Sequence, residues 1–242
     1  MFGIASFAMS QLEGSLQTST LENNKRHKKS CLLLLEKRVI FAQLIFKAMS
    51  TGYKIVDQGA LHYVTFQIVN WVDLFARQVY RDIVIDSLKF CQTNKELEIY
   101  AFVIMSNHIH IVLRSGIGKL SDTIREFKSY TAKQILLAIE MEQESRRDWM
   151  LNLFEFAAKQ HKRNEKYQIW PHENHAELIY SDDFIFQKIN YIHDNPVRAG
   201  IVEKPEDYLY SSARDFAGMP CLLDIVPIYM PTEKLPIMRT VR

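Results

Sequence analysis

YAFVIMSNHIHIVLR at Tyr100–Arg114 contains two short apolar runs joined by Ser106 and Asn107. Runs of this length and composition, broken by a turn, predict two paired β-strands. Side chains alternate across a strand, so His108 and His110 leave the second strand on the same face. Two imidazoles on one face can hold a metal ion, although most isolated pairs of this kind are only a polar edge of a sheet.

The composition is that of an ordinary globular chain of 242 residues, with 48% hydrophobic residues, 24% charged residues and a formal net charge of +2. This balance does not by itself indicate a nucleic-acid-binding protein, although basic residues gather at Lys25–Lys29, Arg146-Arg147 and Lys159–Arg163. Three widely spaced cysteines predict neither a disulfide framework nor a zinc site. No apolar run reaches the roughly 18 residues of a membrane span, so we expect a cytoplasmic protein.

The segments on either side of the hairpin predict an α+β domain. A strand is expected within Gly59–Asn70, followed by a helix from Asp73, its N-cap, to about Thr93. The two strands of the hairpin come next, and after the break at Ser115–Gly118 a long helix is expected over Leu120–Glu144. This order is that of the ferredoxin-like split βαβ fold, an antiparallel sheet with helices on one face.

A fourth strand is needed to complete such a sheet, and two segments could supply it. They are Tyr167–Trp170 and Glu177–Tyr180, and the sequence alone does not choose between them. We expect an extra C-terminal helix over Ser181–His193, ended by the Asn-Pro pair at 195–196. An extra short strand is expected at Leu222–Val226.

Both ends of the chain differ from this central part. Gln11–Ser30 is polar, and Cys31–Ala48 presents no clear docking face. We therefore expect residues 1–48 to be a poorly ordered appendage or to precede the true translation start at Met49. Residues 229–242 are expected to be a tail, which leaves 49–228 as the folded domain.

Tyr130 lies on the long helix predicted after the hairpin. Six side chains form the stripe of this helix that should pack on the sheet: Leu120, Ile124, Phe127, Thr131, Ile135 and Ala138. Tyr130 lies roughly 100° from the centre of that stripe, where a tyrosine usually packs with its hydroxyl in solvent. Beside a cation held by His108 and His110, its phenol could instead attack a phosphate. Gln134, one turn later, could bring an amide oxygen to the same cation.

Three ordered blocks of the sequence resemble a known family. They are VIMSNHIHIV at Val103–Val112, FKSYTAKQI at Phe127–Ile135 and YIHDNPVRAGIVEKPEDYLYSSA at Tyr191–Ala213. On these residues the chain resembles the REP-associated tyrosine transposases, which are HUH single-tyrosine transposases. The similarity runs from about Met49 to Ile228, with WPHENHAEL at Trp170–Leu178 inside it, and does not cover residues 1–48.

The resemblance implies a metal-dependent enzyme that cleaves and rejoins single-stranded DNA near hairpins of palindromic repeats. Tyr130 would form a 5′-phosphotyrosine and release a 3′-hydroxyl, and the 3′-hydroxyl of a second strand would reverse the step. His108, His110 and Gln134 carry over as ligands of Mg²⁺ or Mn²⁺. We expect a homodimer or a monomer that acts at the bacterial nucleoid and has no membrane partner.

Lys133, Arg198 and Trp170 are candidate DNA contacts. Arg198 could bind a phosphate and Trp170 could stack on an unpaired base. The simpler alternatives are that Arg198 caps the carbonyls of the helix before it and that Trp170 packs in the core. Tyr191 is a further candidate for stacking, and it is also, with Tyr180, the next candidate for the nucleophile after Tyr130.

Two other functions fit parts of the pattern. A replication initiator or relaxase would share the histidine pair and the tyrosine, but the chain is short and has no helicase motif. A non-catalytic, RRM-like module would share the topology, yet it would carry aromatic side chains where the central strand has His108 and His110. An inactive transposase that only binds hairpins is a third alternative. The intact histidines and Tyr130 favour an enzyme.

Overall fold

The computed structural model describes residues 54–141, 143–160 and 166–228. These residues belong to one compact unit, which begins at Gly52. The expected appendage at 1–48 and the expected tail at 229–242 lie outside the described residues, so the domain limits remain predictions. In the part of the chain that is described, no helix combines the length and the apolar character needed to cross a membrane.

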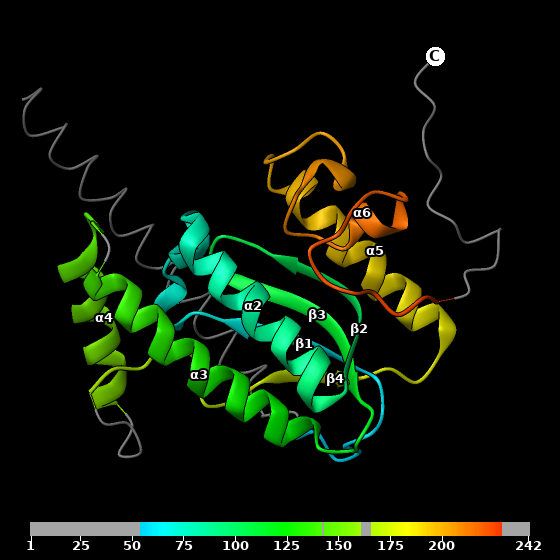
Figure 1. Ribbon diagram of the computed structural model, residues 1–242, viewed down its shortest axis with the longest axis horizontal. Coiled ribbons are helices and arrows are strands. Elements are labelled where there is room, and N and C mark those ends of the chain that lie inside the picture. The colour runs from blue at the N-terminus through cyan, green and yellow to red at the C-terminus, as the bar shows by residue number, and fades with distance from the viewer. Residues whose placement is uncertain (1–53, 142, 161–165, 229–242) are drawn as a thin grey trace, which may run out of the picture. The chain divides into compact units, whose positions relative to one another are not determined.

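Four strands form one antiparallel sheet (Figure 1). They are β1 (His62–Gln67), β2 (Leu97–Ile104), β3 (His108–Ser115) and β4 (His175–Leu178), in the order β2-β3-β1-β4. The hairpin predicted at the Ser-Asn turn is the pair β2-β3, and the strand order is that of the split βαβ arrangement. The α+β class and the four-stranded antiparallel sheet are therefore confirmed.

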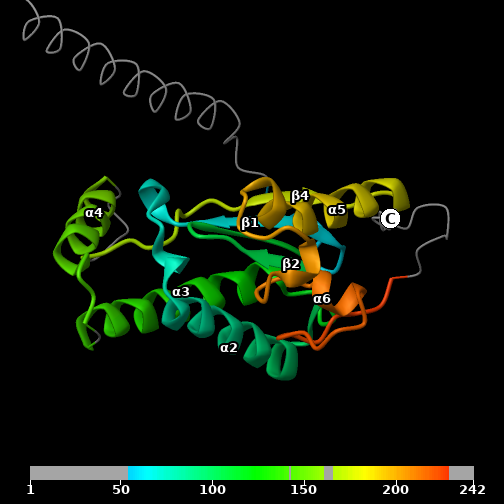
Figure 2. The ribbon, with the colours of Figure 1, turned by 90° about the horizontal axis from the view of Figure 1, so that it is seen from above.

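Helices lie on both faces of this sheet (Figure 2). α2 (Gln78–Lys95) and α3 (Leu120–Met141) lie together on one face, and α5 (Asp182–Arg198) covers the other. The remaining helical elements are short or peripheral: η1 (Val69–Trp71), η2 (Leu74–Ala76), α4 (Arg147–Lys159), η3 (Pro205–Asp207) and α6 (Ala213–Phe216). The predicted extra C-terminal helix is thus α5, which forms a second helical layer. The helix α4 was not predicted.

The core lies between the sheet and the α2–α3 layer. Ile109 and Ile111 of β3 are fully buried on that face. α3 packs there through its predicted stripe, and the ring of Phe127 lies 5.4 Å from that of Phe66 on β1. Burying an aliphatic or aromatic side chain of this size contributes about 1.5–3 kcal/mol, so this face supplies much of the stability.

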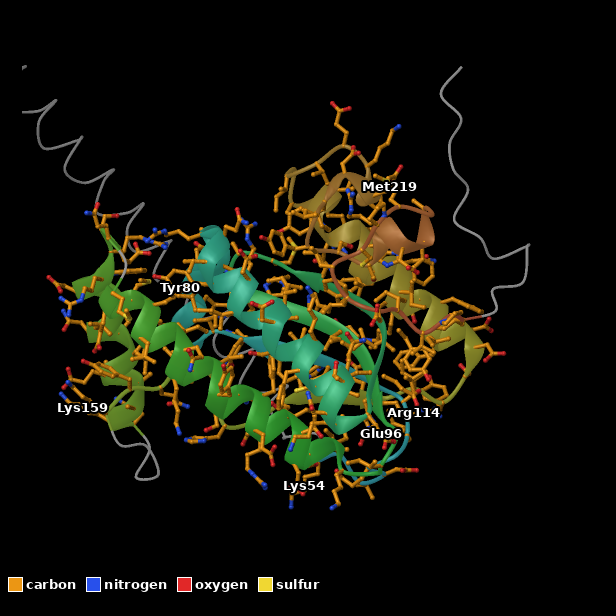
Figure 3. All side chains as sticks on the ribbon, in the orientation of Figure 1. Lys54, Tyr80, Glu96, Arg114, Lys159 and Met219 are labelled. Atoms are coloured by element: carbon orange, nitrogen blue, oxygen red, sulfur yellow. The ribbon has the colours of Figure 1, made fainter. Side chains whose placement is uncertain are left out.

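Two predicted helix ends differ from the structure, and the acidic side chain at each has a distant partner. Asp73 does not cap α2; its carboxylate accepts hydrogen bonds from Ser106 Oγ at 2.6 Å and Asn107 Nδ2 at 3.2 Å in the hairpin turn. α3 ends at Met141, short of Glu144, whose buried carboxylate accepts a hydrogen bond from the hydroxyl of Tyr80 on α2, labelled in Figure 3. Each carboxylate therefore joins two segments that are distant in the sequence.

α5 begins where predicted but does not stop at the Asn-Pro pair. Ser181 caps it by accepting a hydrogen bond from Phe184 N, and Pro196 is a buried residue inside its last turn. A proline costs a helix the bond to the carbonyl four residues earlier, and near the end of a helix little follows that could be disrupted. Gly200, at φ 70°, then ends the run.

The two competing segments for the fourth strand are resolved in favour of the second. β4 begins at His175, two residues before the predicted start at Glu177, and pairs with β1. The strand predicted at Leu222–Val226 is wrong. That segment runs beside β2 with a hydrogen bond from Val226 N to Ile99 O but does not form a strand.

Candidate active site

His108 and His110 leave β3 on the face opposite α2 and α3, as the alternation of the strand predicts. Their register partners Gln67 and Thr65 lie on the same face of β1. The two imidazole centroids are 4.6 Å apart and the ring planes make an angle of 68°. His110 is buried and His108 is half-buried. The pair therefore forms one compact group on this face.

A hydrogen bond orients His108. Its Nδ1 lies 2.7 Å from Asn107 Oδ1. The orientation of the Asn107 amide follows from its other bonds, because Nδ2 donates to the carbonyl oxygen of Trp71 and to the carboxylate of Asp73. An amide oxygen can only accept, so His108 carries its proton on Nδ1 and presents the lone pair of Nε2.

Two hydroxyl groups hold the second imidazole. His110 Nδ1 lies 2.7 Å from Tyr63 Oη and 2.9 Å from Thr65 Oγ1, both on β1. The tautomer that donates from Nδ1 again leaves the lone pair on Nε2. Bonds of this kind are the usual means by which a protein orients histidines that bind metals.

Burial keeps both imidazoles neutral at pH 7. It lowers the pKa of His108 to about 4. The pKa of His110 falls to about 3, first through burial and then through the charges of His108, Lys188 and His175. Two neutral rings that are protonated at Nδ1 would each present the lone pair of Nε2 to a divalent cation. Within the described residues, no third histidine, cysteine or carboxylate joins them.

Tyr191 of α5 covers the histidine pair. Its ring centroid lies 5.3 Å from that of His110 and 6.5 Å from that of Tyr63, in both cases at a steep angle. The side chain is 39% exposed, so one part of the ring meets the pair while another meets solvent. The second sheet layer thus brings a phenol to the histidines.

Other α5 side chains near Tyr191 are polar or basic. Lys188 lies one turn before it, with Nζ 4.2 Å from the centroid of the Tyr63 ring and 2.8 Å from a carboxylate oxygen of Glu177. Asn195 lies one turn after it and donates from Nδ2 to the carbonyl of Tyr191 at 2.8 Å. The guanidinium of Arg198 is 5.5 Å from the centroid of the Tyr191 ring.

Tyr130 and Gln134 do not lie with the histidine pair. α3 packs on the face that carries Phe66, whereas His110 and its partner Thr65 are on the opposite face. The sheet therefore separates the half-exposed Tyr130 from the histidines. The helical wheel located the packing stripe of α3 correctly, but a wheel does not say which face of the sheet receives it.

The three predicted DNA contacts have different outcomes. Trp170 is 5% exposed and donates from Nε1 to Thr131 Oγ1 at 3.0 Å, so it is a core residue and no base can stack on it. Lys133 is exposed on α3, away from the histidines. Arg198 is exposed and lies beside Tyr191, where it could meet a phosphate.

Tyr63, Thr65 and Asn107 were not singled out from the sequence. Tyr63 and Thr65 alternate on β1 as the histidines do on β3, a pattern that places all four on one face once the register is known. Tyr191 was considered only for stacking and as a second candidate for the nucleophile. Its position four residues before Asn195, in the third sequence block, could have suggested more.

Comparisons with known proteins found a matching family model and similar solved structures. A family model described as "Transposase IS200 like" matches residues 61–162, a segment that contains the histidine pair but ends before Tyr191. A solved structure of a REP-associated tyrosine transposase bound to a REP hairpin is 19% identical, with 78% of this chain and 99% of that chain covered and a TM-score of 0.46. A candidate transposase from Deinococcus radiodurans R1 is 16% identical over 56% of this chain and 90% of that chain, with a TM-score of 0.35. No curated protein matches the chain.

Proposed function

Residues 61–162 match a family model described as "Transposase IS200 like", and from that premise we propose that the chain is a transposase of this kind that cleaves and rejoins single-stranded DNA on the α5 face of its sheet. The observation that carries the proposal is the contact between Tyr191 and the histidine pair, with 5.3 Å between the ring centroids of Tyr191 and His110. A phenol, two neutral imidazoles and an arginine lie together there, which is the set that a phosphotyrosine reaction needs.

Tyr191 is the nucleophile in this proposal and takes the place of Tyr130. Its phenol oxygen attacks the scissile phosphorus, the new O–P bond makes a 5′-phosphotyrosine, and the bond from phosphorus to the 3′ oxygen breaks. The phenol proton passes to water and the released 3′ oxygen takes one up. A 3′-hydroxyl from a second strand reverses the step, so the energy of the phosphodiester is kept.

The residues around Tyr191 orient the groups that react. Nε2 of His108 and of His110, with Oδ1 of Asn195 in the role first given to Gln134, would hold Mg²⁺ or Mn²⁺. When bound, such a cation offsets the charge that develops on the phosphate. Asn107 orients the imidazole of His108, and Arg198 neutralises a phosphate oxygen beside the phenol.

Single-stranded DNA with hairpins of palindromic repeats is the substrate class that we propose. The three sequence blocks that resemble REP-associated tyrosine transposases support this choice. The tyrosine and both histidines come from one chain, so a monomer would be sufficient for one cleavage step.

A covalent adduct tests the proposal. Hairpin oligonucleotides labelled at the 3′ end, taken from palindromic repeats near the gene, would be incubated with the protein and Mn²⁺ and separated in denaturing gels. Wild type and Tyr130→Phe should both retain the label on the protein, because Tyr130 lies across the sheet. Tyr191→Phe, which removes only the hydroxyl, should retain none. An adduct that survives in Tyr191→Phe and is lost in Tyr130→Phe would reject this assignment.

A further inference from the structure

Trp71 lies beside the histidine pair in an unusual backbone conformation. Its ring centroid is 6.0 Å from that of His108, at an interplanar angle of 77°, and the side chain is 46% exposed. Trp71 and the preceding Asn70 have φ values of 54° and 55°. Such values are uncommon outside glycine and strained for a bulky residue, and strain of this kind tends to occur at functional sites.

The loop that carries Trp71 is tied to the turn that carries His108. Ile68 N donates to Asn107 O at 2.9 Å, and Phe75 N donates to Ser106 O at 2.8 Å. The side chain of Asn107 donates to the carbonyl of Trp71 at 3.4 Å and at the same time orients His108. The backbone that carries the indole is therefore tied to the turn that carries His108.

The other two tryptophans show how different this position is. Trp170 is 5% exposed and packs between α3 and the sheet. Trp149 is 51% exposed, but it lies in the first turn of α4, where the backbone is regular. Only Trp71 of the three combines exposure, a strained backbone and a contact with the proposed active site.

We propose that Trp71 is a stacking platform for one unpaired base next to the scissile phosphate. The inference rests on the proposed function, which brings a phosphate of single-stranded DNA to His108 and His110. A base and its phosphate are separated by one sugar, so a base on Trp71 belongs to the nucleotide at the cut or to its neighbour. Aromatic platforms of this kind hold single strands irrespective of sequence.

The test measures binding with the chemistry switched off. Tyr191→Phe protein would be titrated with a fluorescent hairpin strand in which one abasic nucleotide is moved along the positions around the cut. Trp71→Asn added to this protein should weaken binding of the intact strand about 5- to 100-fold, the usual effect of losing one stacked base. Asparagine tolerates a positive φ, so the loop should keep its conformation.

The abasic series locates the stacked base. One abasic position should weaken binding by the same factor when Trp71 is present and have little further effect in Trp71→Asn, since both changes remove the same stack. Trp71→Phe should keep most of the affinity. Trp149→Ala, a change to the similarly exposed tryptophan on α4, should leave the affinity unchanged. Thermal melts would compare the folding of all variants.

Equal abasic penalties with and without Trp71 would overturn the inference. So would an unchanged DNA affinity in Trp71→Asn together with a changed oligomeric state in light scattering, which would assign the indole to a contact between copies of the chain. If Trp71→Asn melts at a lower temperature than wild type, the DNA affinities of Trp71→Phe and Trp71→Leu are compared in its place. Leucine keeps the apolar bulk but has no ring, so only Trp71→Leu should lose the stacking. If Tyr191→Phe loses the adduct but substitution of Trp71 does not change DNA affinity, the stacking platform is rejected and the proposed function stands.

Discussion

α3 and α5 carry a similar set of side chains on opposite faces of the sheet. Each has a tyrosine followed one helical turn later by a side-chain amide: Tyr130 with Gln134, and Tyr191 with Asn195. α3 packs on the face that carries Phe66, and its tyrosine is exposed on the side of the sheet opposite the histidines. α5 lies over His110 and brings its tyrosine to the histidines. The difference teaches that local spacing cannot separate a helix that packs on the core face from one that covers the histidines, because the topology decides which face each helix covers.

Apart from the loss of the Tyr191 hydroxyl, the largest effect should follow from removing an imidazole on the α5 face. His110→Ala should slow adduct formation about 10³-fold or more, because groups that merely orient metal ligands already contribute 10–100-fold. DNA affinity, measured by anisotropy, should change far less. A chelator should have the same effect on wild type. Adduct formation at the normal rate in His110→Ala would show that the α5 face is not the reactive one.

A change in the α3 layer should affect stability and leave the site of reaction unchanged. Burial by itself would raise the pKa of Glu144, but hydrogen bonds from Arg146, Arg77 and Tyr80 lower it to about 2. With 1.36 kcal/mol for each pKa unit, a fall from 4.5 to about 2 corresponds to about 3 kcal/mol of stability.

This contribution is complete above the unfolded pKa of 4.5 and is lost as the pH falls toward 2. Glu144→Gln should therefore lower the melting temperature at pH 7. The stability of this variant should also depend less on pH between 5 and about 2 than that of wild type. At a temperature where both proteins are folded, the adduct should form on the same tyrosine. A melting temperature at pH 7 equal to that of wild type would contradict this role for Glu144.

A smaller effect is expected from the amide that orients His108. Asn107→Ala removes the acceptor of the Nδ1 proton and should slow adduct formation about 10–100-fold. Gln134→Ala on α3 is the matched control, because it also removes a side-chain amide and should change the rate less than about twofold. If adduct formation slowed equally in the two variants, the α3 face would contribute to the reaction as much as the α5 face, which would contradict the account.

The hairpin and the packing stripe of α3 were predictable because each depends on short-range periodicity. β3 alternates histidines with isoleucines, and α3 repeats apolar residues every three to four positions. These patterns depend on the covalent geometry of strands and helices. They need no knowledge of the neighbouring elements.

The place of the tyrosine could not be predicted in the same way. Whether Tyr130 or Tyr191 meets His110 depends on which sheet face each helix covers, and that depends on connections and on burial across the whole domain. Trp170 was misjudged for a related reason, since its partner Thr131 is 39 positions away in the sequence. The carboxylate of Asp73 accepts hydrogen bonds from the distant hairpin turn and does not cap the nearby helix.

The most direct test of the account is to find the tyrosine that carries the DNA. The wild-type adduct would be digested with a protease and a nuclease, and the peptide bearing the remaining nucleotide would be identified by mass spectrometry. The account predicts one modified peptide, with the 5′-phosphate on Tyr191 of α5. A nucleotide on Tyr130 of α3 would contradict it, because the reactive face of the sheet would then be the one that the core occupies.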